Sequence, residues 1–282
     1  MNKLGRRGFL TLGLVTIAAA SAGVLSRVVG RKRLRFPYLS GSLAASEYQA
    51  LAAMPGWKAS RIPVAPGIAL NGLVRPPQAA DAPWVLFYQG NDASMLRSGQ
   101  AWLSALAGER DWGLAIYAYR GYDSSAGEPV LKDLAADAPE ILAQLCATEQ
   151  VERSHVHVVG FSIGGHLAVR AVAGAVKTPP PPASLTLLAP VDDIVMVRRS
   201  FYQRFDPGDD FQTRPFLDAI PAPVLVVQGT ADEALIGPDQ GRAIAAALGS
   251  RARYIELPDV GHIALLSNER VFAAVRDFIS AR

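Results

Sequence analysis

The sequence predicts an α/β fold with a mostly parallel central sheet that helices cover on both faces. From about residue 58 onward, short apolar runs alternate with longer helix-like segments. The apolar runs are continuous rather than alternating with polar residues, which is typical of strands buried on both sides. With 282 residues, half of them apolar, the chain is long enough to bury one large core.

Six continuous apolar runs are the expected strands: Trp84–Gln89, Leu114–Tyr119, His155–Gly160, Leu185–Ala189, Pro223–Gln228 and Arg253–Leu257. Segments with helical periodicity separate them and are expected around Arg97–Glu109, Leu131–Glu149, Ser162–Val176, Pro238–Leu248 and Asn268–Ala281. In such a sheet, ligands bind beyond the carboxyl ends of the strands. Functional side chains are therefore expected in the segments that directly follow the strands.

Two segments stand apart from this pattern. Residues 1–35 form an N-terminal signal or anchor segment, and residues 36–282 form a single domain with a short insertion at about 191–222. Residues 1–35 hold eight of the 28 Lys and Arg residues and no Asp or Glu, which leaves 20 basic against 25 acidic side chains in the remainder. The basic pI of about 9.1 thus belongs to the leader, and no nucleic-acid partner is expected.

The leader resembles a twin-arginine export signal, in Arg6-Arg7-Gly8-Phe9-Leu10, although Gly5 stands where that signal usually has a polar residue. The apolar stretch of residues 9–25 is at the lower limit of a bilayer-spanning helix, so it would also serve as a membrane attachment. We expect export to the periplasm or anchoring in a bacterial inner membrane. The basic cluster that begins at Arg27 leaves a cytoplasm-facing anchor as the alternative.

The most informative motif is Gly160-x-Ser162-x-Gly164, between a strand-like run and a helix-like segment. A serine at the apex of a tight strand-to-helix turn is a nucleophile elbow, and this turn requires small residues two positions away on each side. The motif predicts Ser162 as a catalytic nucleophile. Pattern matches of five residues are common in a chain with 25 glycines, so further residues are needed to support it.

Two further side chains follow later strands in the order that a serine nucleophile requires. Asp232, in Gln228-Gly229-Thr230-Ala231-Asp232, can orient an imidazole, and His262 lies in a loop after the last expected strand. The order Ser162, Asp232, His262 predicts a catalytic triad. Asp192 and Asp193, after the strand Leu185–Ala189, offer the alternative position for the acid.

The other titratable candidates are expected to be structural. His155 and His157 alternate with valines along one expected strand, and His166 lies on the helix after the elbow. Cys146, the only cysteine, is expected to be a buried small residue, so no intramolecular disulfide can form. The histidines and the cysteine have no metal-ligand spacing, and we expect neither a metal nor an organic cofactor.

An oxyanion hole is the remaining requirement of acyl transfer, since backbone N–H groups must face the tetrahedral intermediate. The amide of Ile163, directly after the nucleophile, is the first expected donor. The second is expected from the turn after Gly90, with Asn91 preferred over Asp92.

Together these motifs resemble the α/β-hydrolases, in the small serine-hydrolase branch with little or no cap domain. The segment from Tyr119 to Pro129 is similar to the Tyr-Arg-Gly-Tyr-Gly-x-Ser-x-Gly-x-Pro loop of that branch. The resemblance extends from about residue 60 to the end. The chain departs from the branch at Gln89, where a histidine is usual, and at Asp123, which replaces a loop glycine.

The resemblance implies a serine hydrolase that cleaves a small uncharged carboxylic ester or related acyl substrate through an acyl-enzyme intermediate. Peptidase, thioesterase and acyltransferase activities use the same triad and stay open. A protein of this fold that binds a ligand or partner without catalysis is the alternative from another class.

The insertion at about 191–222 is too short for a large helical cap. Its aromatic residues are expected either to form a thin apolar lid or to pack against the sheet edge: Phe201, Tyr202, Phe205, Phe211 and Phe216. Three of its arginines are expected to face solvent, with a substrate anion as the alternative partner: Arg198, Arg199 and Arg204.

Overall fold

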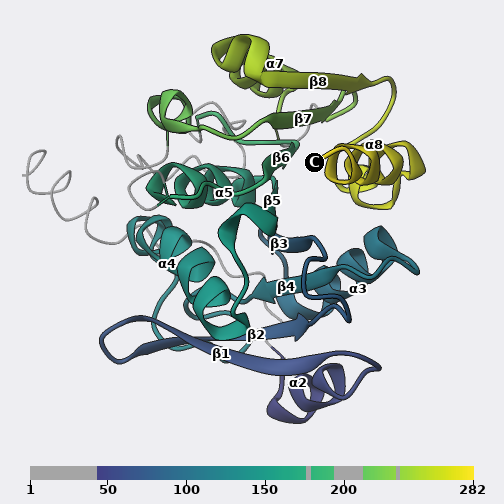
Figure 1. Ribbon diagram of the computed structural model, residues 1–282. Helices are drawn as coiled ribbons and strands as arrows, with labels where there is room; N and C mark the ends of the chain where they lie inside the picture. Colours follow the sequence, from purple (N-terminus) through teal and green to yellow (C-terminus); the bar gives the residue numbers. More distant parts are fainter. Residues whose placement is uncertain (1–42, 176–178, 194–211, 233–235) are drawn as a thin grey trace, which may run out of the picture.

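The computed structural model describes residues 43–175, 179–193, 212–232 and 236–282. Within them, one eight-stranded sheet has the strand order β1-β2-β4-β3-β5-β6-β7-β8 (Figure 1). The strands are β1 Lys58–Ala65, β2 Ile68–Arg75, β3 Trp84–Tyr88, β4 Gly113–Tyr117, β5 Val156–Phe161, β6 Ser184–Leu188, β7 Val224–Gly229 and β8 Ala252–Leu257. All neighbouring strands from β4 to β8 are parallel, whereas the pairs β1–β2 and β2–β4 are antiparallel.

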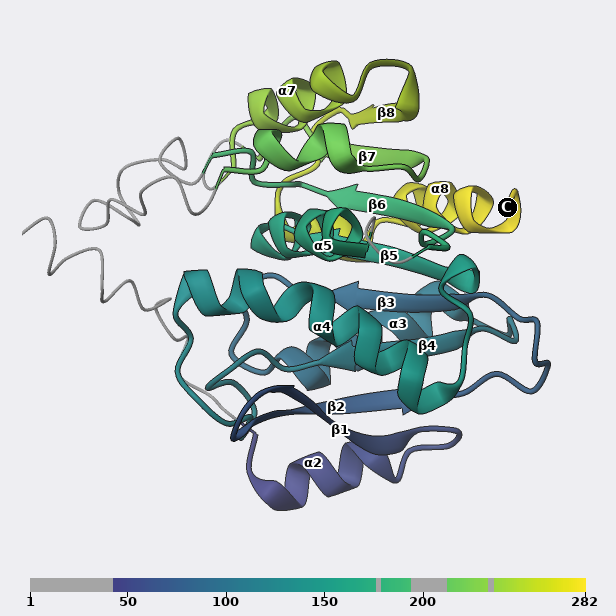
Figure 2. The same ribbon diagram turned by 60° about the vertical axis from the view of Figure 1, so that its left-hand side comes forward.

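Helices cover both faces of this sheet, as the sequence predicts. One face carries α4, α5 and α7, and the other carries α3 and α8 (Figures 1 and 2). The α-helices are α2 Ala45–Ala52, α3 Met95–Ala107, α4 Leu131–Glu149, α5 Ile163–Gly174, α7 Pro238–Leu248 and α8 Glu269–Ser280. The short 3₁₀ helices among the described residues are η1 Arg153–His155, η5 Arg214–Ala219, η6 Gly249–Arg251 and η7 Ile263–Ser267.

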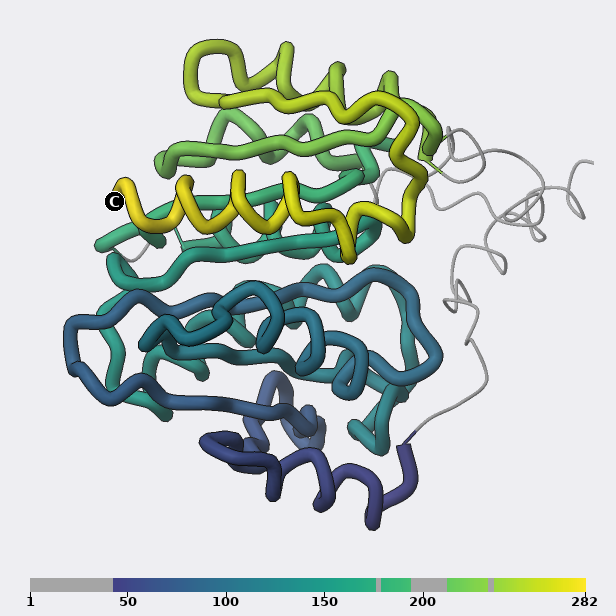
Figure 3. Tube along the Cα trace, turned by 90° about the vertical axis from the view of Figure 1, so that its right-hand side faces the viewer, coloured from purple at the N-terminus to yellow at the C-terminus, as the bar shows by residue number. Residues whose placement is uncertain are grey.

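The core lies between the central strands and these helices. Every residue of β3, β4, β5, β6 and β7 is buried, which explains why their sequences read as continuous apolar runs. On the face of α3 and α8, the ring of Phe87 stacks on Trp102 at 4.3 Å, and Trp102 lies 6.1 Å from Phe272. These contacts join β3, α3 and α8, which lie side by side in Figure 3.

The first two strands and α2 are absent from the expected elements. β1 and β2 form an antiparallel hairpin that extends the sheet beyond β4, and α2 lies at this edge. The hydroxyl of Tyr48 on α2 donates to the carbonyl oxygens of Ser60 and Gly72, at 3.1 and 2.9 Å. The helix is thereby fastened to both strands of the hairpin.

The N-terminal segment 1–35, with its expected export signal and its apolar stretch 9–25, lies outside the described residues. So do Phe201, Tyr202, Phe205 and Phe211 of the insertion, together with Arg198, Arg199 and Arg204. In the part of the chain that the structure describes, no helix has both the length and the apolarity needed to cross a membrane.

Candidate active site

Ser162 occupies the turn between β5 and α5 in a strained backbone conformation. Its φ of 56° and ψ of −125° lie in a region that L-residues rarely adopt. Two backbone hydrogen bonds hold the turn: the Ser162 amide donates to the Leu188 carbonyl at 2.9 Å, and the Gly165 amide donates to the Ser162 carbonyl at 2.9 Å. This is the geometry that the elbow motif predicts.

The glycines of the motif are explained by close packing. A Cβ atom on Gly160 would lie 2.4 Å from the carbonyl oxygen of Gly164. One on Gly164 would lie 2.1 Å from the carbonyl oxygen of Tyr88. Both distances are far below van der Waals contact, and the obstructing atoms are backbone, so larger side chains would displace the turn or β3.

Asp232 lies in the loop after β7 and is 1% exposed. Its Oδ2 accepts a hydrogen bond from Gln228 Nε2 at 3.1 Å, and its Oδ1 accepts one from the Ile236 amide at 3.3 Å. These two donors satisfy both oxygens of the buried carboxylate and orient it.

His262 follows β8, and its Nδ1 lies 2.7 Å from Asp232 Oδ2. An ionised carboxylate can only accept, so Nδ1 carries the proton and the lone pair of a neutral imidazole is on Nε2. The ring is 4.7 Å from that of Phe161, which precedes Ser162 in the chain. The imidazole is therefore packed beside the elbow.

Close contacts between the Asp232 and His262 loops bring the two side chains together. The Ala231 amide donates to the Val260 carbonyl at 3.1 Å, and the Asp259 amide donates to Thr230 Oγ1 at 2.9 Å. A Cβ atom on Gly229 would lie only 2.0 Å from the Val260 carbonyl oxygen. The glycine three residues before Asp232 thus makes room for the other loop.

Asp192 and Asp193, the alternative acids, have other partners. Arg214 Nε donates to Asp192 Oδ2 at 2.6 Å, and Asp193 forms an isolated β-bridge with Gln212. The two aspartates close the base of the insertion. Among the described residues, it is Asp232 that accepts the hydrogen bond of the His262 imidazole.

The turn after β3 lies close to the Ser162 turn. A Cβ atom on Gly90 would lie 3.2 Å from the Cβ of Ser162. The Gly90 amide is already engaged, because it donates to Oε1 of Gln89 at 2.9 Å. The Asn91 side chain is held by the Tyr122 hydroxyl, which donates to Asn91 Oδ1 at 2.9 Å.

The amide of Ile163, the other expected donor, directly follows Ser162 in the chain. Ile163 is the first residue of α5, so its N–H has no acceptor within the helix. The Asp92 carboxylate contacts its own loop, because its Oδ1 accepts a hydrogen bond from the Ser94 amide at 3.1 Å. The turn that carries Asn91 is therefore close to Ser162, and Ile163 directly follows this serine in the chain.

Known proteins were compared with this chain at the levels of family, sequence and structure. No family model matches it. An uncharacterised protein of Mycobacterium tuberculosis, present in two strains, is 26% identical over 271 residues, with 94% of this chain and 92% of the relative covered.

The solved structures give a clearer likeness. An esterase of Pyrococcus furiosus superposes with a TM-score of 0.66 at 14% identity, over 89% of this chain and 98% of the esterase. The 2,6-dihydroxy-pseudo-oxynicotine hydrolase has a TM-score of 0.66 at 18% identity, over 83% and 70% of the two chains. A puromycin-hydrolysing peptidase of M. tuberculosis has a TM-score of 0.62 at 18% identity, over 80% of this chain and 39% of the peptidase.

The chain has the α/β-hydrolase fold.

The two departures from the α/β-hydrolase loop pattern have structural roles here. Besides accepting from the Gly90 amide, Gln89 donates through Nε2 to Ser98 Oγ at 3.1 Å. Its carbonyl accepts from the Tyr119 hydroxyl at 2.7 Å. Gln89 thus fixes the turn that carries Asn91, a role that the sequence alone did not indicate.

Asp123, which stands where the loop usually has a glycine, has a positive φ of 44°, a conformation that favours glycine. Its buried carboxylate accepts from the Leu96 amide in the first turn of α3 at 2.8 Å and from the Leu43 amide at 3.1 Å. Burial raises the pKa of Asp123, and the backbone donors oppose that change. The side chain thus joins the start of α3 to Leu43, which precedes α2.

The remaining histidines belong to the packing of the α/β-hydrolase fold. His157 Nδ1 lies 2.8 Å from Ser184 Oγ, and burial lowers its pKa to about 4. His166 Nδ1 lies 3.0 Å from Thr213 Oγ1, and burial lowers its pKa to about 3. The expectation for His155 was wrong in one respect, because it lies in η1 and not on the strand with His157.

Two smaller expectations concern Cys146 and Phe216. Cys146 is only half-buried on α4, rather than fully buried, although burial still raises the pKa of its thiol. Phe216 in η5 packs against Arg170, whose guanidinium lies 4.0 Å from the centre of the phenylalanine ring.

Among the described residues, no cluster of three His, Cys, Asp or Glu side chains is arranged to hold a metal.

Proposed function

We propose that this protein is a hydrolase of the serine type, with Ser162 as nucleophile, His262 as general base and Asp232 as the residue that orients the histidine. The observation that carries the proposal is the 2.7 Å contact of Asp232 with His262 Nδ1, beside a strained serine turn. The structural likeness to an esterase, a peptidase and another hydrolase supports hydrolysis as the general chemistry.

The proposed reaction begins when Ser162 Oγ attacks the carbonyl carbon of the substrate and His262 Nε2 takes the serine proton. The oxyanion that forms accepts hydrogen bonds from the amides of Ile163 and Asn91. The intermediate collapses, the leaving group takes the proton from His262, and an acyl-enzyme remains. Water, activated by the same imidazole, then releases the acid and restores Ser162.

Asp232 has two functions in this scheme. It keeps the proton of a neutral His262 on Nδ1, so that Nε2 can accept the proton of Ser162. It also stabilises the imidazolium that appears when the serine proton is transferred. No step requires a cofactor or a metal.

The proposed substrate is a carboxylic ester with a small uncharged acyl group. The esterase of P. furiosus matches this chain over nearly the whole length of both proteins, which favours an ester. Phe161 and Ile163, on either side of the nucleophile, are apolar. A panel of esters, thioesters and aminoacyl amides of increasing acyl length would rank the alternatives, and a higher kcat/KM for amides would favour a peptidase.

The experiment that tests the proposal is labelling with a fluorophosphonate probe. We expect wild type to be labelled at Ser162 and S162A to be unlabelled. S267A is the matched control, because Ser267 is an exposed serine close to His262 in sequence, and it should label at the wild-type rate. Labelling of wild type no faster than S162A would support a binding protein without catalysis.

A further inference from the structure

Gln228 is a fully buried polar residue near the end of β7, directly before the loop that carries Asp232. Its Nε2 donates to Asp232 Oδ2 at 3.1 Å. This is the same oxygen that accepts the 2.7 Å hydrogen bond from His262 Nδ1. Oδ2 of Asp232 therefore accepts two hydrogen bonds, one from the proposed base His262 and one from Gln228 on β7.

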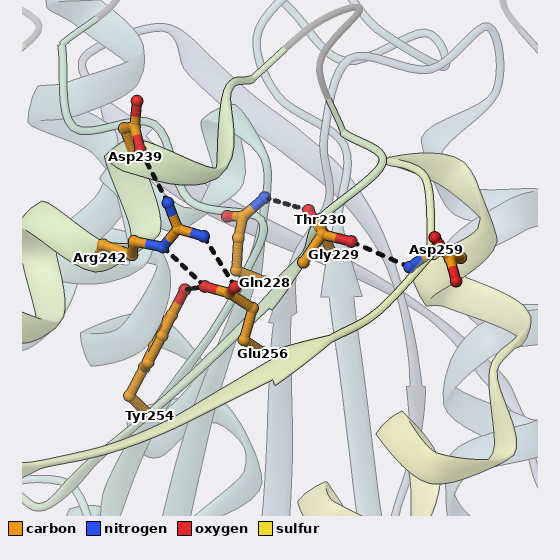
Figure 4. A network of polar contacts seen from close by, with 8 residues as sticks. All are labelled: Gln228, Gly229, Thr230, Asp239, Arg242, Tyr254, Glu256 and Asp259. Carbon is orange, nitrogen blue, oxygen red and sulfur yellow. Dashed lines mark hydrogen bonds and ion pairs between the residues drawn. The ribbon is translucent and has the colours of Figure 1, made fainter.

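The orientation of the Gln228 amide follows from this contact, because a carboxylate can only accept. Nε2 must face Asp232, and it also lies 3.4 Å from the carbonyl oxygen of Gly229 (Figure 4). Oε1 then points away and has no hydrogen-bond partner among the described residues, although it is buried. A buried carbonyl without a partner lowers stability, so an apolar side chain would serve folding better at this position.

Helix α7 fixes the Gln228 side chain in this orientation. A Cβ atom on Gly241 would lie 2.7 Å from Gln228 Oε1 and 3.1 Å from its Cβ, so the helix backbone closes over the amide. Arg242, the next residue, donates to both carboxylate oxygens of Glu256 on β8 at 2.8 and 2.7 Å. Figure 4 shows this ion pair beside Gln228, with the Tyr254 hydroxyl donating to Glu256 at 2.6 Å.

We propose that Gln228 is a positioning residue that holds the Asp232 carboxylate toward His262 and disperses part of its negative charge. The inference rests on the proposed function. Without the Nε2–H donor, Asp232 loses one of the two hydrogen bonds that fix Oδ2. More charge then remains on that oxygen, which makes His262 more basic.

The decisive variants are Q228M and Q228E, which keep the length of the side chain. Q228M has no donor, so we expect kcat/KM for an ester substrate to fall about tenfold and the acid limb of its pH profile to move to higher pH. Q228E can donate only while its carboxyl group is protonated, and the neighbouring Asp232 raises the pKa of that group. Its kcat/KM relative to wild type should therefore fall as pH rises, whereas the same ratio for Q228M stays level above the His262 midpoint.

A packing role makes a different prediction. If Q228M keeps the wild-type kcat/KM and midpoint, or if Q228E and Q228M show the same pH-independent loss, the proposal is overturned. Q100M is the control, because Gln100 is also buried and donates to a backbone carbonyl, that of Leu51, far from the site in sequence. It should lower thermal stability and leave the pH profile unchanged.

Fluorophosphonate labelling separates this proposal from the proposed function. If wild type is not labelled at Ser162, the hydrolase assignment fails and the kinetic comparison has no meaning. If wild type is labelled and Q228M matches its labelling rate at every pH, only the role of Gln228 is refuted. Circular dichroism of each variant establishes that a lost rate is not lost folding.

Discussion

Gly229→Ala tests whether the packing of two loops holds the candidate triad together. Gly229 ends β7, three residues before Asp232, and the Val260 carbonyl of the other loop lies directly over it. An added Cβ would be 2.0 Å from that oxygen, and real contacts of this kind essentially never fall below 3.0 Å. At least one of the two loops must therefore move by about 1 Å.

The size of this shift sets the expected effect on rate. Val260 is two residues from His262, so the displacement reaches the imidazole and lengthens its 2.7 Å contact with Asp232. A misplacement of about 1 Å in a catalytic constellation can cost about 100-fold in rate. Overpacking of this kind also typically costs about 1–3 kcal/mol of stability.

The assay is kcat/KM on a chromogenic ester together with Tm, for wild type, G229A and G261A. Gly261 is the matched control, because it is adjacent to His262, yet a Cβ there meets only the Ala231 carbonyl oxygen, at 3.8 Å. G229A should lose about 100-fold in kcat/KM and several degrees in Tm, while G261A stays close to wild type in both. Equal losses in the two variants, or a G229A rate within twofold of wild type, would refute the reasoning.

Three further outcomes are expected. D232N should lower kcat by about 10⁴-fold while still folding, because a neutral amide neither fixes the His262 tautomer nor stabilises the imidazolium; a loss under tenfold would contradict the role of Asp232. Stability should fall as pH drops from about 6.5 to 4, because burial, reinforced by the charge of Arg282, lowers the pKa of His157 to about 4, so the unfolded chain binds a proton that the folded chain does not. Above pH 6.5 His157 adds no pH dependence to the free energy of unfolding, and between about pH 6.5 and 4 that free energy should fall by up to about 1.4 kcal/mol per pH unit. Urea titrations of wild type and H157N should show a weaker dependence of stability on pH in the variant. Finally, replacing Arg6-Arg7 by Lys-Lys should retain the protein in the cytoplasm, as measured by cell fractionation, and unchanged export would exclude a twin-arginine route.

The central strands could be predicted from the sequence because a strand that is buried on both faces consists of a continuous run of apolar residues. All six expected strands correspond to observed ones, β3 to β8, with ends that differ by one or two residues. The hairpin of β1 and β2 was missed because it is an edge element in which exposed residues such as Arg61 interrupt the apolar pattern. A signal was available in the Pro66-Gly67 turn, where Gly67 adopts a φ of 73°.

The candidate site was only partly predictable for a related reason. The elbow is a local motif, so the strain at Ser162 and the need for Gly160 and Gly164 follow from a few adjacent residues. The hydrogen bond from Gln228 to Asp232 and the one from the Gly90 amide to Gln89 depend on side-chain directions, which no local sequence pattern predicts. Gln228 lies in an apolar run, and only its hydrogen bond to Asp232 indicates why a polar residue is there.

The hydrogen bond from the Leu43 amide to the Asp123 carboxylate fixes the position of the segment just before α2. Asp123 also binds the first turn of α3, which follows the carboxyl end of β3, the same end of the sheet from which the Ser162 turn emerges. Residue 43 is thus pinned on the side of the candidate catalytic machinery rather than on the opposite side. A membrane or partner that held the chain directly before residue 43 would therefore lie on the same side of the sheet as the Ser162 turn.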